Sequence, residues 1–224
     1  MKRMKTIAIF LALILVVPAF AQDSDDSKKN EFGLTIGAEV IPQQSFRYGS
    51  PATNQVDVKP GSSVVFGFNY ARRVKTGQKA AFFIEFPIFA GPSHSLAYKF
   101  APVPVSPAPV PTSLATLYIT PSFRVNFKPE NRVSPWLSFG GGYAFYEGSK
   151  KVGGGISNPD RNTHTGVLQF GGGLDLRTPI KVVKPIGLRA EVRDFHTFDS
   201  LNYGLGRAGG QDNLIFAGGL ILKF

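Results

Sequence analysis

The chain has no cysteine among its 224 residues, which excludes disulfide bonds, zinc–thiolate sites and thiol catalysis. Beyond the N-terminal segment, no stretch approaches eighteen consecutive apolar residues, so the sequence predicts no transmembrane helix. Methionine is rare, whereas glycine (25) and phenylalanine (20) are abundant. Because glycine costs about 1 kcal/mol in a helix interior, this composition favours strands over helices.

The N-terminal segment has the three parts of a secretory signal peptide. A basic start is followed by an apolar stretch over residues 7–17, and small residues at Ala19 and Ala21 precede the expected cleavage point. Residues 1–21 are therefore predicted to be a cleaved signal peptide. The polar, patternless residues 22–30 are predicted to form a flexible periplasmic tether.

The mature chain is basic. Removing the leader leaves 22 basic residues against 15 acidic ones, a net charge of +7. Such an excess favours anionic lipid or polysaccharide as a partner. We expect no nucleic-acid binding from an exported chain.

From Glu31 onward the hydrophobic period is two, which is the signature of strands. The alternation is clear in "VLQFGGGLDLR", where one face carries leucine and phenylalanine and the other carries glycine and charge. Eight such runs are present, at residues 31–41, 63–72, 79–90, 115–128, 134–146, 164–178, 184–194 and 212–224.

The charges in these runs all lie on one face. When the phase of each run is set from its apolar residues alone, nine central charges lie on the opposite, polar face: Glu39, Glu85, Arg124, Asp175, Arg177, Arg189, Glu191, Arg193 and Lys223. The rest of that face is dominated by glycine and alanine. Small residues with balanced charges suit the interior of an eight-stranded barrel, which side chains can fill. The apolar face is then outside, towards lipid.

The connections alternate in length. Long segments over residues 42–62, 91–114, 147–163 and 195–211 are separated by short turns. Short periplasmic turns and long external loops are typical of outer-membrane barrels. The predicted fold is therefore an all-β, eight-stranded antiparallel up-and-down transmembrane β-barrel over residues 31–224, with both termini in the periplasm.

Together these features resemble the small outer-membrane β-barrels of the OmpA-type superfamily. The resemblance rests on the eight runs, the glycine-rich "PWLSFGGGYAFY", the charged "LRAEVRDF" and the last run, which ends in an aromatic. It implies that Leu220, Leu222 and Phe224 form the signal read by the barrel assembly machinery. The chain ends at the barrel, so the cell-wall anchoring of OmpA-type proteins is not implied.

The inward charges are the first candidate site. The expected polar network of the lumen comprises Glu39, Glu85, Arg124, Asp175, Arg177, Arg189, Glu191 and Arg193. We expect Glu85 and Arg124 to pair, since they lie at similar heights on adjacent strands. The network predicts either structural packing of a closed lumen or a narrow pore that can open.

Three further features are candidate sites. His94, His164 and His196 lack zinc-ligand spacing, so surface histidines are expected. The stretch "DFHTFDSLNYG" places His196, Ser200 and Asn202 near the outer rim, but its spacing differs from the H-x-S-N arrangement of lipid A deacylases. The proline-rich residues 100–113 predict a polyproline II rod, as a spacer or a recognition surface.

The sequence thus predicts a monomeric protein of the bacterial outer membrane, without cofactor or metal. Its expected partners are outer-membrane lipid, lipopolysaccharide, the barrel assembly machinery and an unidentified extracellular ligand. We expect a non-enzymatic structural or interaction role through four extracellular loops. A narrow channel for small solutes or ions is the first alternative, and a lipid A-modifying acyl hydrolase is the second.

Overall fold

The computed structural model describes residues 29–48, 54–77, 79–101, 110–129, 131–152, 155–159, 161–177, 186–199 and 209–224. The predicted signal peptide and residues 22–28 of the tether lie outside this part of the chain. Asn30, which we had placed in the tether, begins the first strand. No helix within the described ranges is long and apolar enough to cross a membrane.

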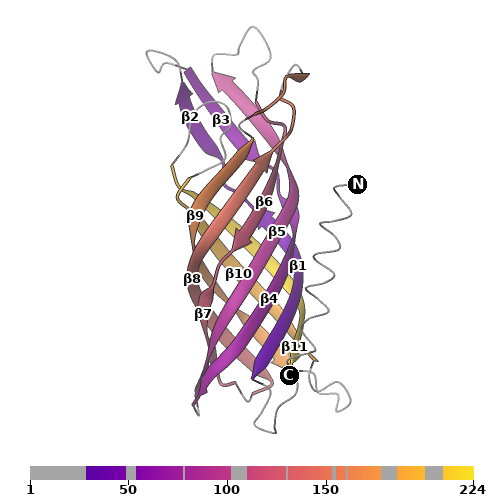
Figure 1. Cartoon of the computed structure of the whole chain (residues 1–224), viewed down its shortest axis with the longest axis vertical. Helices are drawn as coiled ribbons and strands as arrows, with labels where there is room; N and C mark the ends of the chain where they lie inside the picture. Colours follow the sequence, from indigo (N-terminus) through magenta and orange to yellow (C-terminus); the bar gives the residue numbers. More distant parts are fainter. Residues whose placement is uncertain are drawn as a thin grey trace.

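Eleven strands form one antiparallel sheet that closes on itself (Figure 1). They are β1 (Asn30–Val40), β2 (Gln44–Tyr48), β3 (Asn54–Pro60), β4 (Ser63–Thr76), β5 (Ala80–Ala101), β6 (Ser113–Ile119), β7 (Ser122–Phe127), β8 (Val133–Gly148), β9 (Asn162–Arg177), β10 (Ile186–Thr197) and β11 (Gln211–Lys223).

The barrel wall is a ring of eight positions, as the sequence predicted. Its order is β1, β4, β5, then β6 and β7 together, β8, β9, β10 and β11, which returns to β1. β6 and β7 share one position because Thr120 and Pro121 interrupt the strand between them, and proline has no amide hydrogen to give to a ladder. The predicted eight-stranded barrel is confirmed.

The last strand closes the ring. β11 pairs with β1 from Glu31 opposite Lys223 to Val40 opposite Leu214. The backbones of Asn30 and Phe224 exchange two further hydrogen bonds, each 2.9 Å long. We call this end of the barrel the terminus end and the opposite end the loop end. Leu220 and Leu222 face outward, and their role in assembly stays a prediction.

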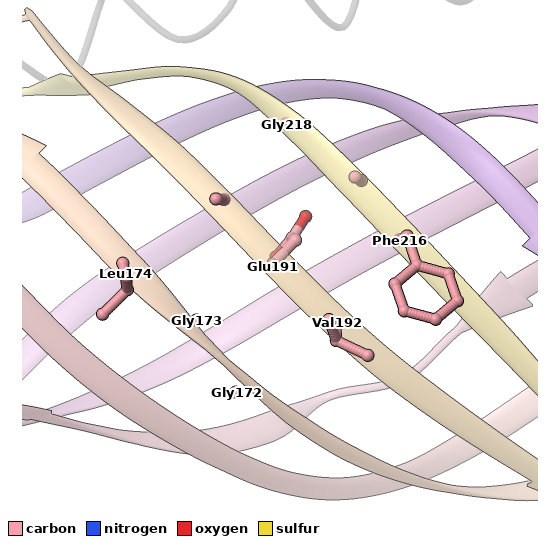
Figure 2. Close-up of a pocket in the computed structure, with 9 residues that line it drawn as sticks. Gly172, Gly173, Leu174, Glu191, Val192, Phe216 and Gly218 are labelled. Atoms are coloured by element: carbon pink, nitrogen blue, oxygen red, sulfur yellow. The ribbon is translucent and has the colours of Figure 1, made fainter.

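The barrel is apolar outside and polar inside. Ile36, Phe123 and Leu220 are 56%, 69% and 54% exposed on the outer surface, whereas charged side chains are buried within. On the exterior of β9, β10 and β11, small residues leave a shallow apolar groove of about 450 Å³ beside Phe216 (Figure 2). This distribution suits a barrel whose outer surface contacts lipid.

The prediction that residues 42–62 form a long loop is wrong in part. Residues 42–62 contain the β2–β3 hairpin, and β3 continues the sheet by pairing with an extension of β5 that reaches Ala101. A register shift between Gly91 and His94 changes which residues of β5 face inward, from odd to even numbers. A bulge of this kind redirects every later side chain. The sequence did not reveal it because the runs beyond the bulge are short.

The seam between β1 and β11 requires a residue without a side chain at position 219. A Cβ on Gly219 would overlap the carbonyl oxygen of Leu34, whereas a Cβ on the adjacent Gly218 would meet only Arg189 O at 3.7 Å. Gly219→Ala should therefore cost about 1–3 kcal/mol through strain in the seam. Gly218→Ala should be neutral or slightly stabilising, since alanine restricts the unfolded chain.

The measurement is the fraction of refolded protein that shows heat-modifiable mobility on a gel. We expect a smaller folded fraction for Gly219→Ala and an unchanged fraction for Gly218→Ala. Equal folding of both variants would show that the seam does not require this close approach.

Candidate functional site

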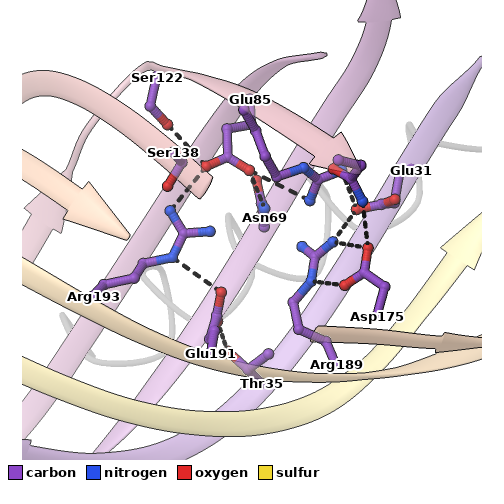
Figure 3. Close-up of polar contacts among 12 residues, drawn as sticks. Glu31, Thr35, Asn69, Glu85, Ser122, Ser138, Asp175, Arg189, Glu191 and Arg193 are labelled. Atoms are coloured by element: carbon purple, nitrogen blue, oxygen red, sulfur yellow. Dashed lines mark hydrogen bonds and ion pairs between the residues drawn. The ribbon is translucent and has the colours of Figure 1, made fainter. Parts of the chain in front are cut away.

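Seven buried charges meet across the terminus-end half of the lumen (Figure 3). Four are acidic and three are arginines, and they extend from five positions of the barrel wall: Glu31, Glu85, Asp175, Glu191, Arg124, Arg189 and Arg193. We call this set the lumen charge network. Strands bring these residues together because every second side chain points inward.

One half of the network centres on Glu31. Arg189 Nη2 donates to Glu31 Oε1 at 2.6 Å, and Arg189 Nε donates to Asp175 Oδ1 at 2.8 Å. Arg124 Nη2 forms an ion pair with the same Glu31 oxygen at 2.8 Å. The predicted network did not include Glu31 because this residue lies at a strand end. Its odd number nevertheless puts it on the same face of the strand as Glu39.

The other half centres on Glu85. Arg193 Nη1 donates to Glu85 Oε1 at 2.9 Å, and Arg193 Nε donates to Glu191 Oε2 at 3.0 Å. The expected pair of Glu85 and Arg124 is present, with Nη1 and Oε2 3.5 Å apart. Asn69 donates a further hydrogen bond of 3.0 Å to Glu85. This carboxylate therefore links three other strands to β5.

The network is almost neutral by itself. Its four acidic groups exceed its three arginines by one, and Lys223 at the terminus-end rim lies 3.9 Å from Glu31 Oε2. Buried ions are tolerated when they are paired and hydrogen-bonded, because the partners replace lost hydration. The arrangement therefore fills the lumen without leaving a large net charge in it.

The single tryptophan lies among the three arginines. Trp136 is 1% exposed, and its ring centroid is 5.1 Å from the guanidinium carbons of both Arg189 and Arg193 and 5.7 Å from that of Arg124. These are cation–π distances. Opposite the ring, a Cβ on Gly173 would come within 2.7 Å of it. The indole is thus packed inside the lumen at the level of the charges.

Glu39 is not part of the lumen charge network, although the sequence predicted one polar network that included it. Higher in the lumen it accepts hydrogen bonds from Thr116 Oγ1 at 2.6 Å and Tyr118 Oη at 2.6 Å. His94 Nε2 lies 3.0 Å from Glu39 Oε2, and His94 Nδ1 lies 2.8 Å from Gly61 O. Because a carbonyl oxygen can only accept a hydrogen bond, Nδ1 of His94 carries a proton. A second proton lies between His94 Nε2 and the Glu39 carboxylate.

The prediction that all three histidines lie at the surface is wrong for His94, which is completely buried. The bulge before it turns its side chain into the lumen. His164 contacts Tyr143 on the exposed exterior, and His196 Nδ1 lies 2.6 Å from Asp212 Oδ1.

Aromatic and aliphatic side chains fill the lumen above the charges. Tyr118 stacks on Phe195 with centroids 4.5 Å apart, and Phe89 meets Phe195 edge-on at 5.6 Å. Above them the hairpin contributes Phe46 and Val56, together with Val58, to the same buried cluster. The inner face of the hairpin therefore continues the apolar packing of the lumen beyond the barrel wall, and we call the hairpin the apolar cap. The contact between His94 and Gly61 lies at its base.

The remaining candidates lie at the rims or outside the described residues. Arg177 donates to the carbonyl oxygen of Pro129 at the terminus end. Ser200 and Asn202 of the hydrolase alternative lie outside the described residues, as do residues 102–109 of the proline-rich stretch. Within the described part of the chain, no three histidine or acidic residues are grouped as a metal would require.

Breaking the lumen charge network should destabilise the barrel. Glu85→Gln keeps the shape of the side chain but removes the carboxylate that faces Arg193 and Arg124, so we expect a loss of about 3–5 kcal/mol in the free energy of unfolding. The fluorescence of the single tryptophan, which lies inside the network, reports denaturant unfolding in lipid vesicles. The matched control is Glu147→Gln, which breaks a partly exposed ion pair of 3.4 Å with Arg161 and should cost about 0–1 kcal/mol. Comparable losses in both variants would refute a special role for the buried pair.

Removing the His94 side chain should loosen the cap and leave the barrel intact. His94→Leu deprives Gly61 O of its donor and Glu39 of its nitrogen partner, and a buried polar group left unpaired costs about 1–3 kcal/mol. We expect amide exchange in β3 to accelerate about tenfold or more while β10 is unchanged, measured by mass spectrometry. His164→Leu on the exterior is the control. Unchanged exchange in β3 would mean that apolar packing alone holds the cap.

No protein-family model matches the chain, and no curated protein matches it in sequence. Its structure is similar to that of Neisserial surface protein A, with a TM-score of 0.50, 12% identity, and coverage of 88% of this chain and 98% of that one. OprG from Pseudomonas aeruginosa has a TM-score of 0.51, 11% identity, and coverage of 88% and 97%.

The outer membrane protein AlkL, solved in lipid bilayers, has a TM-score of 0.50, 14% identity, and coverage of 92% of this chain and 95% of that one. Identities this low concern the fold alone. The chain therefore shares the eight-stranded β-barrel fold of these outer-membrane proteins.

Proposed function

We propose that the protein is an integral barrel of the bacterial outer membrane with a closed lumen, and that it presents an interaction surface outside the cell. The observation that supports this proposal is the burial of side chains at three levels of the described part of the lumen. Charges lie around Trp136 at the terminus end, aromatic side chains lie around Phe195 in the middle, and apolar side chains of the β2–β3 hairpin lie at the loop end.

The predicted export signal, the apolar exterior and the shared fold all support an outer-membrane location. In lipid, every backbone polar group must be paired within the protein, and a closed barrel achieves this. With the short turns and both termini in the periplasm, as in barrels of this kind, the β2–β3 hairpin lies outside the cell.

The interaction surface is the outer face of β2, β3 and the upper part of β5. We call it the extracellular platform, and its exposed or half-exposed residues are Ser45, Arg47, Gln55, Asp57, Lys59 and Lys99. Hydrogen bonds from Gln55 at 3.0 Å and Ser45 at 2.7 Å, with the nearby charge of Lys99, lower the pKa of the Asp57 carboxyl. The platform is thus polar and ordered by its own contacts, which suits a polar extracellular ligand.

A lumen filled in this way should not conduct. We expect the purified protein to be electrically silent in planar bilayers over a wide voltage range, and liposomes that contain it not to swell in small sugars. Liposomes with a general porin are the positive control, and heat-modifiable mobility of the reconstituted sample verifies that the barrel is folded. Uniform conductance steps from the folded protein would overturn the closed lumen and support the channel alternative.

A further inference from the structure

The accessible charges of the barrel are distributed unevenly between its two ends. Six exposed cations lie at the terminus end, and we call them the basic collar: Lys29, Arg72, Lys75, Lys79, Lys128 and Arg132. In the described residues, the acidic groups nearest this rim are Glu31 and Asp175, which are both buried inside the lumen. The accessible acidic residues of the described chain lie at the loop end: Asp57, Glu147, Asp194, Asp199 and Asp212.

The collar is continuous around part of the rim. The amide of Arg73 donates to Lys29 O at 2.7 Å, which places Lys29 beside the end of β4. The amide of Lys128 donates to Lys79 O at 2.8 Å, which places the two short turns side by side. The cations therefore form one band instead of separate surface charges.

The collar also lies where the apolar exterior ends. Val74, Phe127 and Val133 are exposed, and each is next to a collar residue or one residue away from it. Lysine and arginine extend their charged ends towards water while their stems cover apolar surface. Alternating cations and exposed apolar side chains are typical of a protein surface at the depth of lipid headgroups.

We propose that the basic collar binds the anionic headgroups of phospholipids in the leaflet at the terminus end. This inference rests on the proposed function, which makes that leaflet the periplasmic one. An anionic phospholipid offers a phosphate to the cations and acyl chains to the adjacent apolar residues, so it satisfies both parts of the surface. A soluble polyanion would use the charges alone, which is why we favour the lipid.

The test uses the full mature chain in phosphatidylcholine vesicles that contain traces of spin-labelled lipid. The fraction of label immobilised at the protein surface measures how strongly each headgroup is preferred. We expect phosphatidylglycerol to be preferred several-fold over phosphatidylcholine at low salt. The preference should fall towards one at high salt, because the Debye length shrinks from about 30 Å at 0.01 M to about 3 Å at 1 M.

Two variants locate the preference. The collar variant K75Q/K79Q/K128Q removes three cations at the terminus end, and the matched variant K150Q/K151Q/R161Q removes three at the loop end. We expect the first to lose most of the preference for phosphatidylglycerol and the second to retain it. An unchanged preference in the collar variant, or a loss only in the matched variant, would overturn the inference.

The outcomes separate this inference from the proposed function. If neither label is immobilised, the protein is not inserted in the bilayer and the proposed function fails. If both labels are immobilised equally, the barrel is inserted and the collar has no lipid preference, so only this inference fails. Binding to isolated peptidoglycan that the collar variant loses, without any lipid preference, would instead assign the collar to the cell wall.

Discussion

The structure depends on the pairing of β1 with β11. Hydrocarbon offers no partner to a backbone amide or carbonyl, so a membrane-spanning sheet cannot leave an edge open. Here the ladder continues to the last residue, where Phe224 and Asn30 exchange two hydrogen bonds. The close approach of Gly219 to β1 permits this seam. The ring of eight positions that this seam closes sets the width of the lumen.

An eight-stranded ring has an interior narrow enough to be filled by its own side chains. This chain fills the lower part with paired charges and one indole, and the upper part with aromatic rings. The charge network gives geometric order, since each guanidinium has a fixed fork of donors. The two layers together support the proposal that the lumen is closed.

Much of the barrel could be predicted from the sequence because a strand has a period of two. The alternation of apolar and polar residues alone predicted that Arg193 points inward and Leu220 outward. The similar heights of Glu85 and Arg124 on adjacent strands indicated that they pair. The same alternation predicts that Glu31 points inward, but its position at the end of a strand left it out of the predicted network. The direction of the charged residues in the terminus-end half of the lumen therefore follows from the sequence.

The cap could not be predicted in the same way, and the physical reason is the bulge in β5. The sequence by itself determined the eight positions, the apolar exterior and the charges of the lumen, because these follow from local alternation. Only the tertiary structure decided that β2 and β3 extend the sheet beyond the barrel wall and that His94 reaches Glu39. Those contacts depend on a change of register after Gly91, which redirects later side chains without altering the composition of the strand.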